Sequence, residues 1–474
     1  MVLLQLLVVL LALYVGSRYG SLALGAVSGI GLAILVLGFG LKPGTPPTDV
    51  IYIIIAAVTC AGLLQASGGM DWMIQVAEKL LRRHPDYITF YAPITTFLLT
   101  VLVGTGHVVY TLMPIICDIS LKKGIRPERP CAVASIASQV GITCSPIAAA
   151  VVAFTTISAA NGFPITIPQV LLVSFPSCLI GLLIASACSY RRGLDLDDDP
   201  QFQERLKSEE FQKYMHGGDV TTLDRGISRN GKRAVYIFLS SILLIVVLAS
   251  FPSLLPSFEE LTVVKGVSAK WNGMSPSQMV KAGILVDGFT EMTEVKLKMN
   301  VVIQIIMVSA AALMIIFCKA QPKKAVAGSV WQSGMVAVIA IYGIAWMADT
   351  FFSNYMVEMQ ILLKDFVQEH PWAIALVFFT VSILLNSQGA VVVSMLPLAY
   401  SLGIPGAVLL GAFPSVYGYF FIPNYPSDIA TVNFDRSGTT RIGKYLLNHS
   451  FMMPGLVCIL VATLLSTLLV NLLY

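Results

Sequence analysis

Long apolar runs, bordered by charged or turn-rich residues, follow one another along most of the chain. A membrane-spanning helix needs roughly 20 apolar residues to cross about 30 Å of hydrocarbon. Ten runs meet this requirement, and two further segments are apolar but interrupted by polar residues. The predicted crossings are 2–17, 21–40, 50–68, 130–160, 167–190, 234–251, 299–318, 329–350, 405–434 and 451–474, and the interrupted segments are 87–117 and 371–400. The pattern predicts an all-α polytopic membrane protein.

The two interrupted segments carry polar residues at a depth where an ordinary membrane helix is aliphatic, and polarity there is costly. The interrupting residues are Gly104, Thr105, Gly106 and His107 in the first segment and Asn386, Ser387 and Gln388 in the second. The segments superpose without a gap, since Gly106 falls on Gly389 and Pro114 on Pro397, both 283 positions apart. Paired interruptions of this kind predict the substrate site of a transporter.

Each interrupted segment has about 30 residues, which is too short for two full crossings, and we therefore interpret both as re-entrant hairpins. Each half then holds five crossings, and an odd number inserts the second half upside down relative to the first. We predict two inverted repeats, 1–190 and 234–474, joined by a polar cytoplasmic linker, 191–233. The polar segment 252–298 is expected to be an outer loop.

The placement of charge supports this topology. With the amino terminus outside, the inner loops hold 23 of the 30 Lys and Arg residues, as the positive-inside rule requires, so both termini are expected in the periplasm. A charged fraction of 12% excludes a soluble globule, and a net charge of +4 is too slight to indicate nucleic-acid binding. The eight cysteines form no CxxC motif, so we expect no disulfide framework, metal site or cofactor.

A helix that breaks inside the membrane turns its free N–H groups and its positive dipole end toward the cavity, which favours an anion. Four breaks are predicted: 104–107, 386–389, 143–146 in the broken helix 130–160, and 423–428 in the broken helix 405–434. None of them contains arginine or lysine. The predicted substrate-binding residues are Gly104, Thr105, Gly106, His107, Ser145, Asn386, Ser387, Gln388, Asn424 and Asp428.

Two of these residues are also candidates for ion coupling. His107 can donate to a carboxylate or accept a proton, because imidazole titrates near physiological pH. The alternative is a neutral histidine bonded to a backbone carbonyl of its hairpin. Asp428 can bind a cation or proton, or it can hold the helix break together. No HExxH, GxSxG or P-loop motif is present, and so no enzyme is indicated.

Four motifs carry a family resemblance: GTGHVVYT at 104–111, RPERP at 126–130, YGIAWM at 342–347 and FDRSGTT at 434–440. With them the chain resembles, essentially from end to end, the anaerobic four-carbon dicarboxylate carriers of the Dcu family, and most nearly the DcuB branch. The resemblance implies a bacterial inner-membrane antiporter that exchanges fumarate for succinate and also carries malate and aspartate. It also implies an elevator-type ion-transporter fold, in which the hairpins and broken helices move against a scaffold.

The resemblance has departures. The family usually reads Pro-Thr-Tyr-Pro where this chain has Asn424 in the second position, and Gln-Ala-Ala where it has Gly389 in the middle. The first region is tied, in DcuB-type members, to partnership with a membrane sensor kinase. We expect a homodimer. Two alternatives stay open: a proton- or sodium-coupled carrier for another organic anion, and a dicarboxylate-binding regulatory subunit of a sensor kinase.

Overall fold

The computed structural model describes residues 1–474 except 20, 47, 216–220, 225, 265–273, 356–368, 424 and 443–447. The described residues form mostly helices, as the apolar pattern predicts. The helices before the linker are α1 (Val2–Tyr19), α2 (Ser21–Ala33) with the π-helical turn η1 (Ile34–Gly38), α3 (Thr48–Ala66), α4 (Gly69–Arg83), α5 (Ile88–Val103), α6 (Val109–Lys122), α7 (Glu128–Val140), α8 (Ala149–Ala160) and α9 (Ile167–Tyr190).

The rest of the chain continues in the same way. The linker holds α10 (Pro200–Leu206) and α11 (Glu209–Met215). The later elements are α12 (Arg229–Ser250), β1 (Ser257–Val263), α13 (Pro276–Lys281), β2 (Thr290–Lys296), α14 (Met299–Cys318), α15 (Pro322–Ala327), α16 (Ser329–Asn354), α18 (Ala373–Leu385), α19 (Gln388–Ser401), α20 (Gly406–Ala412), α21 (Pro426–Phe434) and α22 (Met452–Leu473).

Fewer helices are suited to cross a membrane than the sequence predicts. Within the described residues, seven helical stretches are long and apolar enough, or eight if Val50–Ala66 and Gly69–Arg83, bent by 72°, form one span. The predicted crossings 2–17 and 21–40 form shorter apolar helices. The predicted crossing 405–434 is broken into α20 and α21, and each piece is under ten residues, or less than about 15 Å long. Neither piece reaches across the hydrocarbon alone.

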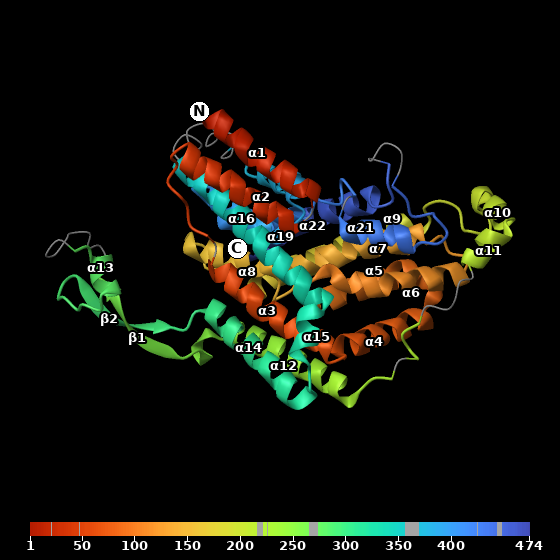
Figure 1. The fold of residues 1–474 in the computed structure, drawn as a ribbon, viewed down its shortest axis with the longest axis horizontal. Helices are drawn as coiled ribbons and strands as arrows, with labels where there is room; N and C mark the ends of the chain where they lie inside the picture. The colour runs from red at the N-terminus through yellow and green to blue at the C-terminus, as the bar shows by residue number, and fades with distance from the viewer. Residues whose placement is uncertain are drawn as a thin grey trace.

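The helices form two groups that meet in the middle of the molecule. In one group, α2 packs against α1 and α16, and α3 packs against α14 and α16. In the other, α5, α7, α9 and α22 pack together. Figure 1 shows α3, α14 and α16 on the left and α5, α6 and α7 on the right. The residues of α7 are all buried, because small side chains let its neighbours approach closely.

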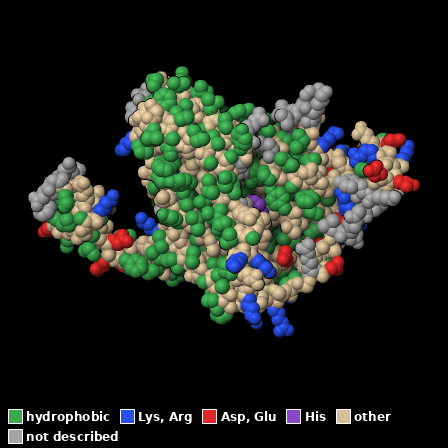
Figure 2. Space-filling view, viewed as in Figure 1, with side chains coloured by type: hydrophobic (Ala, Val, Ile, Leu, Met, Phe, Trp, Pro, Cys, Tyr) green, Lys and Arg blue, Asp and Glu red, His purple; other side chains and the backbone are tan. Residues whose placement is uncertain are grey.

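The surface agrees with a membrane environment. Figure 2 shows hydrophobic side chains over most of one face, with Lys and Arg gathered along the lower edge and at the right-hand end. Large apolar side chains are exposed on helices of both groups, among them Leu37, Leu243, Ile316 and Leu464. Such a surface suits contact with lipid, where charged groups are costly.

The linker is anchored to the helical body. Arg126 Nη1 lies 2.8 Å from Asp199 Oδ2, and Arg129 Nη1 lies 2.7 Å from Asp195 Oδ1. Asp199 also caps α10, because its Oδ1 accepts from the first backbone N–H groups of that helix. Burial raises the pKa of the Asp199 carboxyl, but these N–H groups and the Arg126 guanidinium outweigh burial, so the pKa lies below its usual value.

Several elements were not predicted, among them α4 and the two strands. α4 is an amphipathic helix whose buried side includes Met70, Met73 and Ile74, while Arg82 and Arg83 end it. In segment 252–298, β1 and β2 pair antiparallel, with Ser257 opposite Lys296. Figure 1 shows these strands projecting from one end of the helical body, opposite α10 and α11.

Candidate functional site

One cavity, of about 350 Å³, is lined by residues of both helix groups. One wall comes from the apolar helices α3 and α16, and the other from two polar breaks. We name these breaks the first tip (residues 104–107, between α5 and α6) and the second tip (residues 386–389, between α18 and the first turn of α19). Seven of the ten predicted binding residues line the cavity: Gly104, Thr105, Gly106, His107, Asn386, Ser387 and Gln388. The two interruptions that the sequence predicts to form a pair therefore line the same cavity.

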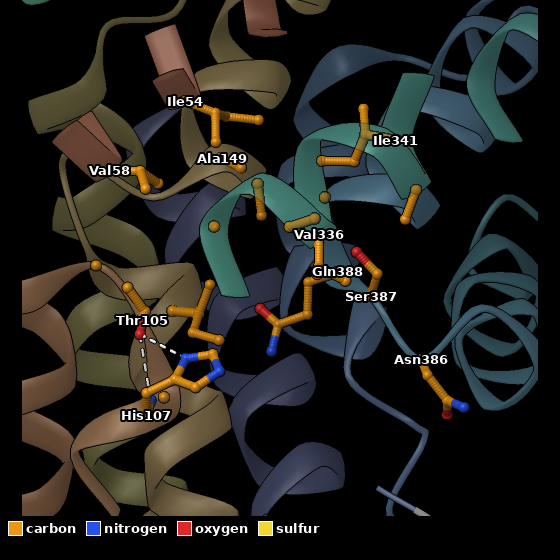
Figure 3. Close-up of a pocket in the computed structure, with 18 of the residues that line it drawn as sticks. Ile54, Val58, Thr105, His107, Ala149, Val336, Ile341, Asn386, Ser387 and Gln388 are labelled. Atoms are coloured by element: carbon orange, nitrogen blue, oxygen red, sulfur yellow. Dashed lines mark hydrogen bonds between the residues drawn. The ribbon is translucent and has the colours of Figure 1, made fainter. Parts of the chain in front are cut away.

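The first tip is built by a left-handed residue followed by an extended one. Gly104 ends α5 with φ 78°, a conformation that glycine adopts without strain, and its N–H donates to Thr100 O at 2.8 Å. Thr105 is extended, and its Oγ1 accepts from the backbone N–H of His107 at 3.2 Å. The same hydroxyl lies 2.8 Å from His107 Nδ1 (Figure 3). The imidazole is thus held by a side chain of its own tip.

The second tip repeats this backbone geometry. Asn386 ends α18 with φ 49°, and asparagine is one of the few residues besides glycine that tolerates this region. Ser387 is extended and caps α19, since its Oγ accepts from Ala390 N–H at 3.3 Å. The conformational partners are therefore Gly104 with Asn386 and Thr105 with Ser387, which are 282 positions apart rather than 283. The second tip has one residue more, since Gln388 lies between its extended residue and Gly389, whereas Gly106 follows Thr105 directly.

Helix N-termini surround the cavity. Its lining includes Gly106 and His107 before α6, Ala149 at the start of α8, Gln388 at the start of α19, and Pro426 at the start of α21. Each of these helices has at least nine residues. Unpaired N–H groups and positive dipole ends favour a negatively charged ligand. No lysine or arginine is among the described lining residues, so the lining offers an anion only backbone N–H groups and uncharged or imidazole side chains.

A hydrogen-bonded group connects the two tips through α7. Gln388 Nε2 donates to the backbone oxygen of Gln139 at 2.7 Å, and the Tyr419 hydroxyl donates to Gln139 Oε1 at 2.8 Å. Gly106 lies directly against the same side chain, because a Cβ there would be 2.4 Å from Gln139 Nε2. From the sequence, Gln139 reads as an ordinary interhelical hydrogen-bonding residue, and only its position beside both tips distinguishes it.

Two of the other predicted binding residues, Ser145 and Asp428, are described and do not line this cavity. Ser145 is fully buried, and its hydroxyl has no hydrogen-bond partner among the described residues. Asp428 is buried in the first turn of α21, where Oδ1 accepts from Ser135 Oγ at 2.7 Å. Asn424 lies outside the described residues. The hydrogen bond between Ser135 and Asp428 joins the start of α21 to α7.

The apolar wall was missed by sequence reasoning. It includes Ile54 and Val58 of α3 and Gly334, Val336 and Ile341 of α16. These residues sit in uniformly apolar helices, so they carry no sequence signal that separates a cavity wall from a lipid-facing or core position. Tyr419 and Tyr425 also line the cavity, and their rings pack against each other with centroids 4.6 Å apart.

Comparison with known proteins gives the same family as the motifs. The whole chain, residues 1–474, matches the DcuA/DcuB family, described as "Anaerobic c4-dicarboxylate membrane transporter". The chain is 42% identical over 456 residues to the anaerobic C4-dicarboxylate transporter DcuB of Escherichia coli O6:H1, covering 96% of this chain and 95% of the relative. It is 33% identical over 459 residues to the C4-dicarboxylate transporter DcuA of Wolinella succinogenes, covering 97% and 96%.

A solved structure shares the fold. The chain is similar to the YdaH transporter of Alcanivorax borkumensis, with a TM-score of 0.51 and 13% identity, covering 95% of this chain and 98% of that one. The greater similarity to DcuB than to DcuA confirms the predicted branch, and the chain is a membrane transporter rather than an enzyme. It belongs to the DcuA/DcuB family of anaerobic C4-dicarboxylate membrane transporters.

Proposed function

We propose that this protein is a secondary antiporter that exchanges four-carbon dicarboxylates, such as fumarate for succinate, across the bacterial inner membrane. The observation that carries the proposal is the meeting of the two tips in one cavity ringed by helix N-termini. A dianion has two separated negative groups, and each tip can hold one of them through its N–H groups. The names of the DcuB and DcuA relatives support the substrate class.

The binding residues that we propose are the tip residues Gly104, Thr105, Gly106, His107, Asn386, Ser387 and Gln388, together with Ser145, Asn424 and Asp428 in the neighbouring breaks. The tips supply hydroxyl, imidazole and amide groups as well as backbone N–H groups. Such contacts hold a hydrated metabolite reversibly, and reversibility suits a carrier, which must release its substrate on the other side.

Movement of one helix group against the other would expose the cavity alternately. The apolar wall of α3 and α16 is then the scaffold, and the tips with the broken helices form the moving domain. We propose that 1–190 and 234–474 are inverted repeats, that 191–233 is cytoplasmic, that both termini are periplasmic and that two copies form a dimer. The repeated left-handed and extended residues at the two tips support the repeat.

Counterflow in proteoliposomes tests antiport. Purified protein is reconstituted into vesicles loaded with unlabelled succinate, and uptake of labelled fumarate is followed. Antiport predicts rapid uptake from loaded vesicles and little uptake from empty ones. Vesicles without protein provide the control. Equal uptake of fumarate by loaded and empty vesicles would contradict the antiport proposal.

The second candidate is a carrier coupled to protons or sodium ions. It is favoured by the lack of lysine and arginine among the described lining residues, since a buried dianion needs compensating charge. His107 and Asp428 are the groups that we propose for coupling. Uptake into empty vesicles that responds to an imposed proton or sodium gradient supports this candidate. Transport by the purified protein alone also separates a carrier from a regulatory subunit that only reports dicarboxylate to a sensor kinase.

A further inference from the structure

The orientation of the Gln388 side-chain amide is set by its neighbours. Gln388 Nε2 lies 2.7 Å from the backbone oxygen of Gln139 and 3.4 Å from the Tyr419 hydroxyl. A carbonyl oxygen only accepts hydrogen bonds, so the amide nitrogen must face Gln139. The Tyr419 hydroxyl already donates to Gln139 Oε1, so toward Gln388 it acts as an acceptor as well. The amide oxygen is therefore turned away from both residues.

The Gln388 Oε1 atom is a buried acceptor without a hydrogen bond from any described residue. Gln388 is 3% exposed, and no donor among the described residues lies within hydrogen-bonding distance of Oε1. The residue lines the cavity, and in Figure 3 its amide extends from the second tip toward His107, while the Asn386 side chain points elsewhere. Buried acceptors are almost always paired in folded proteins. A ligand in the cavity is thus expected to bring a donor.

Four-carbon dicarboxylates differ in this respect. Fumarate and succinate are dianions without a hydrogen-bond donor at neutral pH, whereas a substituent at the second carbon can add a hydroxyl, as in malate, or an ammonium, as in aspartate. We propose that, among the four-carbon dicarboxylates that this cavity exchanges, those with a donor at the second carbon bind more tightly than fumarate and succinate, and that Gln388 Oε1 accepts from this donor. The proposal rests on the proposed function, namely that this cavity holds the dicarboxylate.

Gln139 and Tyr419 act as positioning residues in this scheme. They hold the amide with its nitrogen inward and its oxygen toward the ligand. A site built to hydrogen-bond a hydroxyl discriminates strongly against the analogue that lacks it, because the buried acceptor is left unpaired. Selection by Gln388 therefore depends on whether the ligand supplies a donor to this single unpaired atom.

Calorimetric titration of the purified full-length protein with matched ligands tests the proposal. L-Malate is succinate with one added hydroxyl, and we expect it to bind about tenfold more tightly than succinate. Fluorosuccinate carries a group of similar size that cannot donate, so it should bind like succinate. Gln388→Met removes the acceptor at similar volume and should bring the malate and succinate affinities together.

Ser394→Ala is the matched control. Ser394 is buried on the same helix and donates to Ala390 O at 2.6 Å, but it does not line the cavity, so this variant should keep the tenfold preference. Equal affinities for malate and succinate in the wild type, or tight binding of fluorosuccinate, overturn the inference even if Gln388→Met does not fold. If no dicarboxylate binds at all, the proposed transport function fails as well as the inference about Gln388. Failure of the inference alone is recognised because dicarboxylates still bind, but without the preference for malate.

Discussion

The glycines of the two tips should respond differently to the same substitution. An added Cβ at Gly106 would lie 2.4 Å from Gln139 Nε2 and 2.7 Å from the backbone oxygen of Ser138, both well inside the ordinary contact range that begins at 3.4 Å. Neither neighbour can withdraw easily, because Gln139 is bonded to Tyr419 and the Ser138 oxygen belongs to the buried helix α7.

At Gly389 the space is larger. A Cβ there would lie 3.1 Å from Ile341 Cδ1, the end of a side chain, and 3.4 Å from Ala149 Cβ. A shift of a few tenths of an ångström relieves this contact, and alanine also stabilises the helix that follows by up to about 1 kcal/mol.

The expected loss of transport rate follows from the steric overlap of the added Cβ with its neighbours. Overpacking of a filled site costs about 1–3 kcal/mol, and a displacement of about 1 Å at a binding group can lower a rate about 100-fold. We expect Gly106→Ala to reduce dicarboxylate counterflow by about 10- to 100-fold with normal membrane insertion. Gly389→Ala should stay within about twofold of the wild type.

Initial rates of labelled fumarate uptake, normalised to reconstituted protein, measure both effects. Gly29→Ala is the control, since a Cβ there meets no atom within 4 Å and the residue lies in the apolar helix α2. A wild-type rate for Gly106→Ala, or an equal loss in both tip variants, would refute the reasoning.

Three further predictions concern polar groups outside the tips. Asp428→Asn keeps the acceptor for Ser135 but removes the charge; if the carboxylate couples transport to protons, the variant loses the pH dependence of uptake between about pH 6 and pH 8, and an unchanged profile contradicts that role. Tyr419→Phe leaves Gln139 Oε1 without its donor, which costs about 1–3 kcal/mol, and we expect weaker substrate binding in titrations. Asp199 has a lowered pKa, so its contribution to linker docking is complete above its unfolded value of about 3.9 and is lost as the pH falls through the lowered one. Limited proteolysis should therefore cut segment 191–233 only below about pH 4 in the wild type but already at pH 7 in Asp199→Ala, and equal cleavage of both at pH 7 argues against anchoring.

The tips were predictable because their composition conflicts with their surroundings. Gly104, Thr105 and His107 interrupt an apolar run, and so do Asn386 and Ser387. A left-handed turn inside a membrane segment favours glycine or asparagine, and a helix cap favours a hydroxyl. These residue types therefore predict both helix ends. The one-residue shift between the tips was not predictable, because the alignment of Gly106 with Gly389 carries no information on which residue before each glycine is left-handed.

The helix α4 and the apolar cavity wall were not predicted, because no polar residue interrupts an apolar run to mark them, and neither was the position of Asp428. The amphipathic helix α4 repeats apolar residues at helical spacing, as in Met70, Met73, Ile74 and Leu81, and a search for unbroken apolar runs passes over it. The walls formed by α3 and α16 are apolar on every side, so nothing in their sequence marks the face that meets the cavity. Placing Asp428 behind the cavity rather than in its wall needs the tertiary contact with Ser135.

The two tips share a backbone design but present different groups, and this difference bears on the substrate. After the extended residue, the first tip makes a 3₁₀ turn that presents the His107 imidazole, whereas α19 begins at once and presents the Gln388 amide. A strictly twofold site would treat both ends of a dicarboxylate alike. Here the N–H groups of the two tips can bind two equivalent carboxylates, but the imidazole and the amide oxygen distinguish the carbon atoms between them. An unsymmetrical ligand such as malate can use this difference, because its second-carbon donor can reach only one of the two tips, which is the selectivity that we propose for Gln388.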